Sequence, residues 1–266
     1  MGAKNLVLSF DVGATGIKAG LVNLKKGQLV GEKYKVGTPH PATPKAIGKE
    51  IKNILKIFKW KSGKVSCGFP SVVKDGVCKT AANIDPSWVN TDAEKVLEKI
   101  TGVPFQVIND ADAAGIAELT YGNALNVSGT VILLTLGTGI GSAVFIDGKL
   151  VPNTELGHIE FKGDIAENAV SNRARKDRML DYEDWAKELN EYLWYLHKIL
   201  SPNLMILGGG ISKRWDLFSH VFSPDLPVTN AKLYNDAGIV GAAVYTHPEF
   251  LPDDLKVKVL SALADS

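Results

Sequence analysis

The chain has 266 residues, of which 45% are hydrophobic and 22% are charged, values typical of a globular protein. Lys and Arg total 30 against 29 for Asp and Glu, so the charge balance gives no reason to expect a nucleic-acid or membrane surface. Two cysteines, Cys67 and Cys78, are too few for a disulfide framework or a cysteine zinc cage. No signal peptide is recognised, and no apolar run reaches the roughly 18 residues that a membrane span needs. We therefore expect a cytoplasmic protein that can bury one or two cores.

The first distinctive stretch is an apolar run, residues 6–10, that ends at Asp11 and is followed by a glycine-containing turn and a second apolar run. This pattern predicts a strand, a tight turn and a strand. Gly13 and Gly16 allow backbone angles or close approaches that a Cβ atom would forbid. Successive N–H groups in such a turn can face an anion, and Lys18 can add positive charge. The alternative is an ordinary hairpin with an exposed lysine, and this stretch alone leaves both interpretations open.

The rest of the chain alternates predicted strands and helices that are separated by short turns. In the first half we expect strands at 27–36, 64–69 and 105–108, a hairpin at 72–78, a polar loop at 80–88, and helices from 43 or 44 to 58, from 91 or 92 to near 102, and at 111–121. In the second half we expect strands at 131–136, 142–146, 204–207 and 227–228, and helices at 182–200, from 212, and at 237–245. The segment 163–181 is charged and poorly periodic.

The opening turn recurs later in the chain, because Thr15-Gly16-Ile17 is repeated as Thr138-Gly139-Ile140. At the same offset the flanking apolar runs match, and both copies lead into a hairpin that ends in Leu-Val. A strand-turn-strand unit repeated at this distance predicts two similar α/β domains, whose two glycine turns could approach one polyanion from opposite sides. We expect the domains to comprise residues 1–109 and 110–266, with the last helix a candidate to pack back on the N-terminal domain.

Two common phosphate-binding motifs are excluded. The chain has no G-x-x-x-x-G-K-[ST] motif, so it has no P-loop. The glycines of 137–141 lie in a predicted hairpin instead of opening a helix, so the dinucleotide-binding fingerprint fails its structural test. The remaining interpretation is a two-lobed fold in which hairpin turns hold phosphates.

Five segments, in chain order, resemble the motifs of the ROK sugar kinases of the actin/hexokinase superfamily. They are a first phosphate motif at 11–18, a catalytic segment at 107–111, a second phosphate motif at 136–141, a sugar-binding signature at 155–158 and an adenosine-side motif at 207–212. The resemblance implies an actin-like, hexokinase-type ATPase fold with two ribonuclease H-like domains facing a central cleft. It also implies Mg²⁺ as a cofactor and a homodimer.

Two departures from the family pattern narrow the resemblance. Ala14 stands where the first motif of the family usually has glycine. Residues 159–181 contain no cysteine, whereas most of the family has a cysteine-rich zinc motif there, so we predict no structural zinc. The polyphosphate glucokinase branch lacks that motif, and the runs at 147–158 and 208–213 resemble this branch. No helix-turn-helix segment precedes Asp11, which argues against the repressor members of the family.

The resemblance also implies roles for individual residues in phosphoryl transfer. Asp110 would take the proton of the sugar 6-hydroxyl, although Asn109 and Asp110 are also suited to cap a helix. Asp11 would hold Mg²⁺, directly or through water. The donor phosphates or nucleotide would contact Asp11, Gly13, Thr15, Gly16, Lys18, Gly137, Thr138, Gly139, Gly209 and Gly210.

The sugar and a long donor would need further groups. Glu155 and His158 would bind sugar hydroxyls, and the further sugar-side candidates are Gly68, Asn83, Asn109 and, less directly, Glu167. Polyphosphate is a polyanion and would need basic residues, for which the available clusters are Arg173, Arg175, Lys176, Arg178, Lys213 and Arg214. The alternative for each of these is a solvated helix face.

The sequence thus predicts an enzyme that transfers the terminal phosphoryl group of inorganic polyphosphate, and of ATP, to the 6-hydroxyl of glucose. One alternative is an ATP-only hexose or N-acylhexosamine kinase of the same fold. Another is a non-catalytic sugar-sensing protein. Sensing would require neither Asp110 nor the two phosphate turns, so their presence argues against this alternative.

Overall fold

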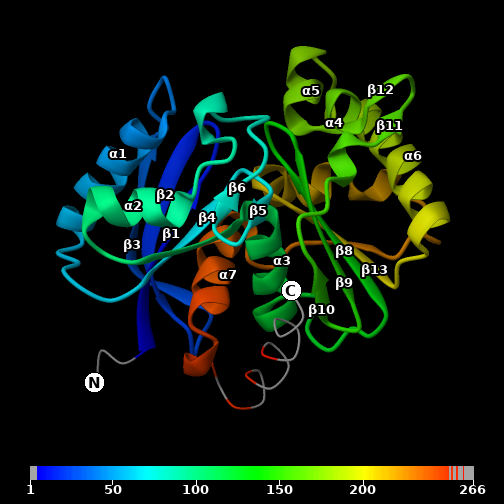
Figure 1. Cartoon of the computed structure of the whole chain (residues 1–266). Coiled ribbons are helices and arrows are strands. Elements are labelled where there is room, and N and C mark those ends of the chain that lie inside the picture. The colour runs from blue at the N-terminus through cyan, green and yellow to red at the C-terminus, as the bar shows by residue number, and fades with distance from the viewer. Residues whose placement is uncertain (1–4, 252, 254–255, 257–259, 261–266) are drawn as a thin grey trace. The chain divides into compact units, whose positions relative to one another are not determined.

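The computed structural model describes residues 5–251, 253, 256 and 260. Contacts divide the chain into two units: residues 1–117 with 236–260 form unit 1, and 118–235 belong to unit 2. The expected boundary lay between residues 109 and 110, whereas here the chain leaves unit 1 within helix α3 (Asp110–Tyr121) and returns just before helix α7 (Ala237–Thr246). Figure 1 shows both sheets with their helices.

The sheet of unit 1 has the strand order β3-β2-β1-β4-β7. Its strands are β1 (Leu6–Val12), β2 (Gly16–Asn23), β3 (Gln28–Gly37), β4 (Val65–Phe69) and β7 (Phe105–Asn109). Strands β1, β2 and β3 pair antiparallel, whereas β1, β4 and β7 run parallel. Because parallel neighbours end at the same edge of a sheet, the residues that follow β1, β4 and β7 are gathered there.

Helices cover both faces of this sheet. Helix α1 (Pro44–Ile57) begins at Thr43, whose hydroxyl accepts a hydrogen bond from the Ala46 N–H at 3.3 Å, and α2 (Ala93–Thr101) ends at Gly102 in the left-handed region. The apolar residues of α1 and α2 pack in one core with Phe10 and its even-numbered neighbours on β1. The odd-numbered Ser9 faces α7 instead, and its hydroxyl donates to the Ile239 carbonyl at 2.7 Å.

The smaller elements of unit 1 agree with the expected turns. Strands β5 (Val73–Lys74) and β6 (Val77–Cys78) form a hairpin whose Asp75-Gly76 turn has positive φ at both residues. The loop that follows contains a short 3₁₀-helix, η2 (Pro86–Trp88). The buried Trp88 indole N–H donates to the Ala42 carbonyl at 2.8 Å, which fastens this loop to the segment that precedes α1.

The sheet of unit 2 repeats the pairing of the first, in the order β10-β9-β8-β13-β14. Its strands are β8 (Thr130–Leu136), β9 (Ile140–Ile146), β10 (Lys149–Val151), β13 (Leu204–Gly208) and β14 (Val228–Asn230). In each sheet the first strand has an antiparallel hairpin on one side and two parallel strands on the other. This common topology confirms the repeat that was inferred from the glycine turns.

The helices of unit 2 include one long element and several short ones. Helix α6 (Tyr182–Leu200) buries the predicted apolar face, with Trp185, Leu189, Leu193 and Leu196 fully covered. The charged segment 163–181 contributes β12 (Asp164–Ile165), which pairs with β11 (Glu160–Phe161), and helices α4 (Ala166–Val170) and α5 (Asn172–Asp177). Elements this short contain too few residues to show a periodicity.

The remaining short elements are 3₁₀-helices, and the helix expected from residue 212 is one of them. They are η3 (Leu156–His158), η4 (Gly210–Leu217), η5 (Ser219–Val221), η6 (Tyr234–Asp236) and η7 (Pro248–Phe250). In the part of the chain that the structure describes, no helix combines the length and the hydropathy needed to span a bilayer.

Candidate active site

In unit 1 the candidate residues meet where β1, β4 and β7 end. Asp11 lies opposite Gly68 in the register of β1 and β4, and Gly68 lies opposite Ile108 of β7. A Cβ atom on Gly68 would lie 3.6 Å from the Cα atom of Asp110. The backbone of β4 at Gly68 therefore lies close to the start of helix α3.

An ion pair joins Asp11 to Lys18, whose Nζ lies 2.6 Å from a carboxylate oxygen. Burial by itself lowers the pKa of Lys18, but the nearby carboxylates of Asp11, Asp110 and Asp236 outweigh it and raise the pKa above its ordinary value. Lys18 therefore stays charged at neutral pH and can stabilise negative charge beside Asp11. Helix α7 approaches closely here, because a Cβ atom on Gly238 would lie 3.0 Å from the Asp11 carboxylate carbon.

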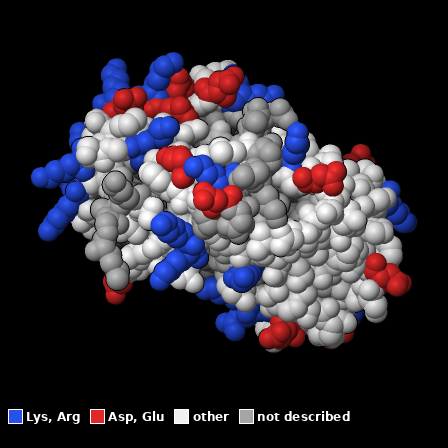
Figure 2. Space-filling model, turned by 90° about the horizontal axis from the view of Figure 1, so that it is seen from below, with Lys and Arg blue, Asp and Glu red and all other residues white. Residues whose placement is uncertain are grey.

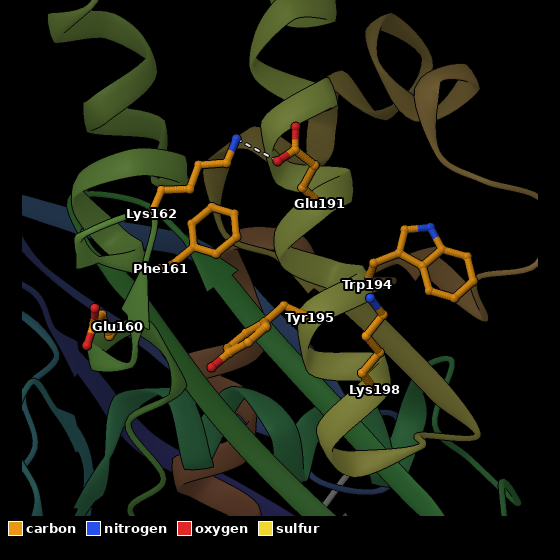
Figure 3. A pocket seen from close by; sticks show the side chains of 7 residues that line it. All are labelled: Glu160, Phe161, Lys162, Glu191, Trp194, Tyr195 and Lys198. Atoms are coloured by element: carbon orange, nitrogen blue, oxygen red, sulfur yellow. Dashed lines mark ion pairs between the residues drawn. The ribbon is translucent and has the colours of Figure 1, made fainter.

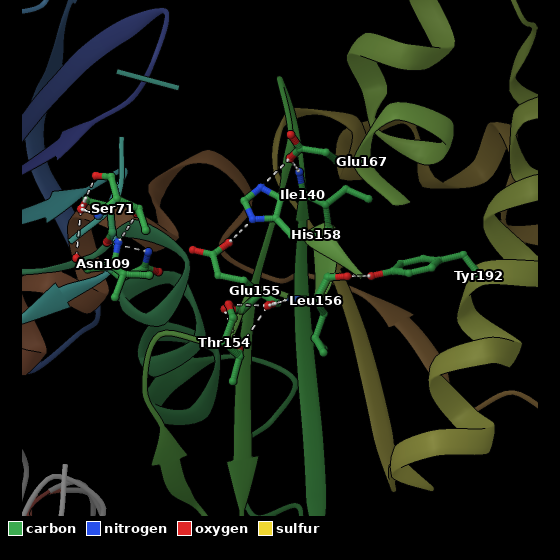
Figure 4. A network of polar contacts seen from close by, with 12 residues as sticks. Ser71, Asn109, Ile140, Thr154, Glu155, Leu156, His158, Glu167 and Tyr192 are labelled. Atoms are coloured by element: carbon green, nitrogen blue, oxygen red, sulfur yellow. Dashed lines mark hydrogen bonds and ion pairs between the residues drawn. The ribbon is translucent and has the colours of Figure 1, made fainter. Parts of the chain in front are cut away.

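Asn109 caps helix α3. Its side-chain oxygen accepts hydrogen bonds from the N–H groups of Ala111 and Asp112 at 2.9 and 3.0 Å, and its amide donates to the Ser71 carbonyl at 3.0 Å (Figure 4). Asp110 accepts a hydrogen bond from the Ala111 N–H at 2.9 Å and is half-buried. The capping interpretation thus fits Asn109, and the half-buried Asp110 is the first residue of the same helix.

The first phosphate turn is closed by a hydrogen bond from the Gly13 N–H to the Gly16 carbonyl at 2.9 Å. Neither glycine has a positive φ. A Cβ atom would lie 3.2 Å from the Gly16 carbonyl oxygen at Gly13, and 3.2 Å from the Val36 carbonyl oxygen at Gly16. Close approach to backbone carbonyls therefore disfavours a side chain at either glycine, whereas Ala14, also outside the left-handed region, carries its methyl group without backbone strain.

In unit 2 the second phosphate turn lies beside the start of the adenosine-side motif. The Gly137 N–H donates to the Gly139 carbonyl at 3.0 Å and closes the turn after β8. Strand β13 runs parallel to β8 and ends at the same edge. Gly209 follows it with φ of 82°, and a Cβ atom there would lie 2.8 Å from the Leu136 carbonyl oxygen, so only glycine fits.

His158 of the sugar-binding signature lies between two carboxylates (Figure 4). Its Nδ1 is 3.5 Å from Glu155, and its Nε2 is 3.8 Å from Glu167. Glu167 also accepts a hydrogen bond from the Ile140 N–H at 3.2 Å. Burial raises the pKa of Glu155, and the negative charge of Glu167 raises it further against the opposing effect of His158.

Three contacts hold the backbone of this signature. A Cβ atom on Gly157 would lie 2.3 Å from the Ile140 carbonyl oxygen, so glycine is required there. The Leu156 N–H donates to the Ser142 hydroxyl at 3.0 Å, and the Tyr192 hydroxyl donates to the Leu156 carbonyl at 2.9 Å. Sequence reasoning missed Ser142 and Tyr192, because they lie on β9 and α6, outside every motif.

Other candidates are not joined to these groups. Asn83 is half-buried in the loop before η2, and within the described residues no contact links it to Asn109 or Asp110. Arg175 bonds to the Leu180 carbonyl at 3.0 Å and lies over the Tyr182 ring, and Arg178 forms a two-pronged ion pair with Glu188. These two arginines therefore have structural partners.

The four remaining basic candidates have exposed side chains, and the described part of the chain gives them no ion pair. They are Arg173, Lys176, Lys213 and Arg214. Arg173 is distinguished by its backbone, whose N–H donates to the Gly137 carbonyl of the second phosphate turn at 3.0 Å.

The expected Mg²⁺ would need oxygen ligands from the chain. Across residues 5–251, no three His, Cys, Asp or Glu side chains are grouped so that they could hold a metal ion by themselves. Mg²⁺ in kinases is commonly bound by one or two carboxylates together with substrate phosphates and water. The single carboxylate of Asp11, at the phosphate turn, fits that mode of binding.

A separate pocket of about 440 Å³ lies between β11 and α6, and no predicted site residue lines it (Figure 3). An ion pair of 2.6 Å joins Lys162 to Glu191 at this pocket. The Phe161 ring, which also lines it, packs edge-on against Tyr192 at 5.6 Å. The pocket wall therefore contacts the tyrosine that holds the sugar-binding signature.

Comparisons with known proteins agree with the motifs. Residues 7–174 match the ROK family. The chain is 44% identical over 235 residues to a protein from Mycobacterium tuberculosis named polyphosphate glucokinase, and the alignment covers 88% of each. It is also similar to the crystal structure of an inorganic polyphosphate/ATP-glucomannokinase from Arthrobacter sp. strain KM, with a TM-score of 0.87, 44% identity and coverage of 90% of this chain and 97% of that one.

A second solved structure, a ROK family glucokinase from Streptomyces griseus in complex with glucose and AMPPNP, has a TM-score of 0.75 and 25% identity. The match covers 90% of this chain and 98% of that one. The chain therefore belongs to the ROK family and has the actin-like ATPase fold of its sugar kinases.

Proposed function

We propose that this chain transfers the terminal phosphoryl group of inorganic polyphosphate, and of ATP, to the 6-hydroxyl of glucose. The observation that carries the proposal is the 44% identity, over 88% of the chain, to a relative named polyphosphate glucokinase. The Arthrobacter relative, whose title includes both polyphosphate and ATP, supports the use of two donors. The half-buried Asp110, beside the Asp11–Lys18 ion pair, supports catalysis over sugar sensing.

In the proposed reaction Asp110 accepts the proton of the 6-hydroxyl as the sugar oxygen attacks the terminal phosphorus. The bond from this phosphorus to the bridging oxygen breaks, and the shortened donor leaves. Lys18 stabilises negative charge on the donor, together with N–H groups of the two glycine turns other than those of Gly13 and Gly137, which close the turns. Mg²⁺, when bound with the help of Asp11, would neutralise donor charge.

Sugar specificity in this proposal comes from unit 2. Glu155 accepts hydrogen bonds from sugar hydroxyls, and His158 donates or accepts according to its tautomer. Glu167, which faces the other ring nitrogen of His158, orients the imidazole and is a further sugar ligand. Asn109 retains one amide hydrogen beyond its bond to Ser71 and can contact the sugar from unit 1. We propose a homodimer, as the family resemblance implies, and a cytoplasmic location.

The test is a coupled glucose 6-phosphate assay, run separately with polyphosphate and with ATP. We expect product with both donors, and product with ATP alone would favour the alternative of an ATP-only kinase of the same fold. The Asp110→Asn variant should lose turnover by about 10²- to 10⁴-fold while it still binds glucose. Turnover that survives this substitution would contradict the role of Asp110, and no product with either donor would contradict the proposed function.

A further inference from the structure

Four positions form a row across the sheet of unit 1 at the first phosphate turn. Gly68 of β4 lies opposite Asp11 of β1, Asp11 opposite Lys18 of β2, and Lys18 opposite Lys35 of β3. Side chains directly opposite one another on antiparallel strands point to the same face. Lys35 is therefore on the face where Lys18 meets Asp11, although no motif in the sequence includes it.

The Lys35 side chain extends over the turn itself. Its Cε atom lies 3.7 Å from the point that a Cβ atom on Gly16 would occupy, which places the lysine stem against this turn residue. Lys35 is exposed, and the described residues supply no hydrogen bond or ion pair to its ammonium group. The neighbouring lysines differ, because Lys18 pairs with Asp11 and Lys33 pairs with Asp236.

This arrangement has an electrostatic cost in the ligand-free protein. Like charges directly opposite on neighbouring strands destabilise a sheet. Asp11 offsets the charge of Lys18, but nothing in the described chain offsets the charge of Lys35. An anion at the turn would be attracted to both ammonium groups and would remove the repulsion between them.

We propose that Lys35 binds the phosphate groups of the donor at the first phosphate turn. The inference rests on the proposed function, which supplies a condensed phosphate, inorganic polyphosphate or a nucleoside triphosphate, as the ligand. Lys35 is then the second cation of the turn: Lys18 remains beside Asp11, and Lys35 holds a phosphate group from the solvent side.

The test compares Lys35→Gln with the wild type. Loss of one charge-assisted hydrogen bond should raise the KM for polyphosphate and for ATP about tenfold or more, with the KM for glucose and kcat little changed. Lys35→Arg should retain most of the donor affinity. The matched control is Lys26→Gln, because this exposed lysine lies at the opposite end of the hairpin that β2 and β3 form.

A second readout separates this inference from the proposed function. Tripolyphosphate should raise the melting temperature of the wild type and of Lys26→Gln more than it raises that of Lys35→Gln. The ligand-free Lys35→Gln protein should be at least as stable as the wild type, because a repulsive contact is lost. Unchanged donor KM and unchanged thermal shift in Lys35→Gln would overturn the inference. A wild type that makes no product but still shows the shift difference would overturn only the proposed function.

Discussion

At the scale of single residues, Glu155 connects the geometry of the site to pH. Its pKa is raised by burial and by the neighbouring Glu167, so the protonated form persists to a higher pH than in an exposed glutamate. Protonation removes the charged acceptor that binds a sugar hydroxyl. The affinity for glucose should therefore fall as the pH is lowered through this raised pKa.

We expect the KM for glucose of the wild type to rise as the pH is lowered, and to begin rising at a higher pH than the titration of an exposed glutamate would give. The Glu155→Gln variant has no carboxyl group to titrate at this position. Its KM for glucose should therefore be higher than that of the wild type at neutral pH and should rise less as the pH is lowered. Steady-state kinetics with saturating donor at each pH measure both curves. Parallel pH dependence in the two proteins would exclude Glu155 as the titrating group.

At the scale of elements, helices α3 and α7 meet through a glycine. A Cβ atom on Gly241 would lie 1.6 Å from the Ala113 carbonyl oxygen, and no side-chain rotation can relieve a clash with backbone. Gly241→Ala must therefore separate the two helices and should lower the free energy of unfolding by about 3 kcal/mol or more. Chemical denaturation measures this change.

The matched control for Gly241→Ala is Gly37→Ala at the end of β3. Nothing lies within 4 Å of a Cβ atom there, and Gly37 lacks the positive φ that disfavours alanine. This control should change stability by less than about 1 kcal/mol. Equal stabilities of the two variants would show that the α3–α7 contact tolerates a methyl group.

Helix α5 presents two arginines with different surroundings. Arg173 is exposed and its backbone is bonded to the second phosphate turn, whereas Arg175 is bonded to the Leu180 carbonyl and lies over the Tyr182 ring. Arg173→Ala should raise the KM for polyphosphate several-fold more than the KM for ATP, because a longer polyanion extends further along the surface.

Arg175→Ala should act on stability instead, with a loss of about 1–2 kcal/mol from the broken hydrogen bond and ring contact. Donor kinetics with short and long polyphosphate, together with thermal melts, distinguish the two effects. If Arg173→Ala raises the KM for polyphosphate and the KM for ATP by the same factor, this arginine does not select polyphosphate.

At the scale of the whole molecule, the chain uses one sheet topology twice, and each copy gathers polar groups where its parallel strands end. In unit 1 the polar groups lie where β1, β4 and β7 end. In unit 2 they are the backbone groups of the turns that follow β8 and β13. Figure 2 shows that Lys and Arg side chains stand beside Asp and Glu side chains over much of one face, in keeping with the balanced total charge. We therefore expect individually positioned cations, such as Lys18, to hold the donor phosphates.

The sequence by itself determined the local features. The two glycine turns, the long apolar face of α6 and the family motifs are contiguous patterns, and short-range backbone geometry produces them. The sequence offered both Asn109 and Asp110 as the cap of α3, and the structure shows the cap at Asn109. The topology shared by the two sheets also followed from the sequence, because a strand-turn-strand pattern was repeated with its spacing intact.

Only the tertiary structure decided which distant residues meet. Lys35 reaches Gly16 through the register of β2 and β3, Glu167 reaches His158 from α4, and Tyr192 holds the Leu156 carbonyl from α6. Such contacts depend on strand register and helix packing, which are set by the burial of whole elements, so no local pattern in the sequence reveals them.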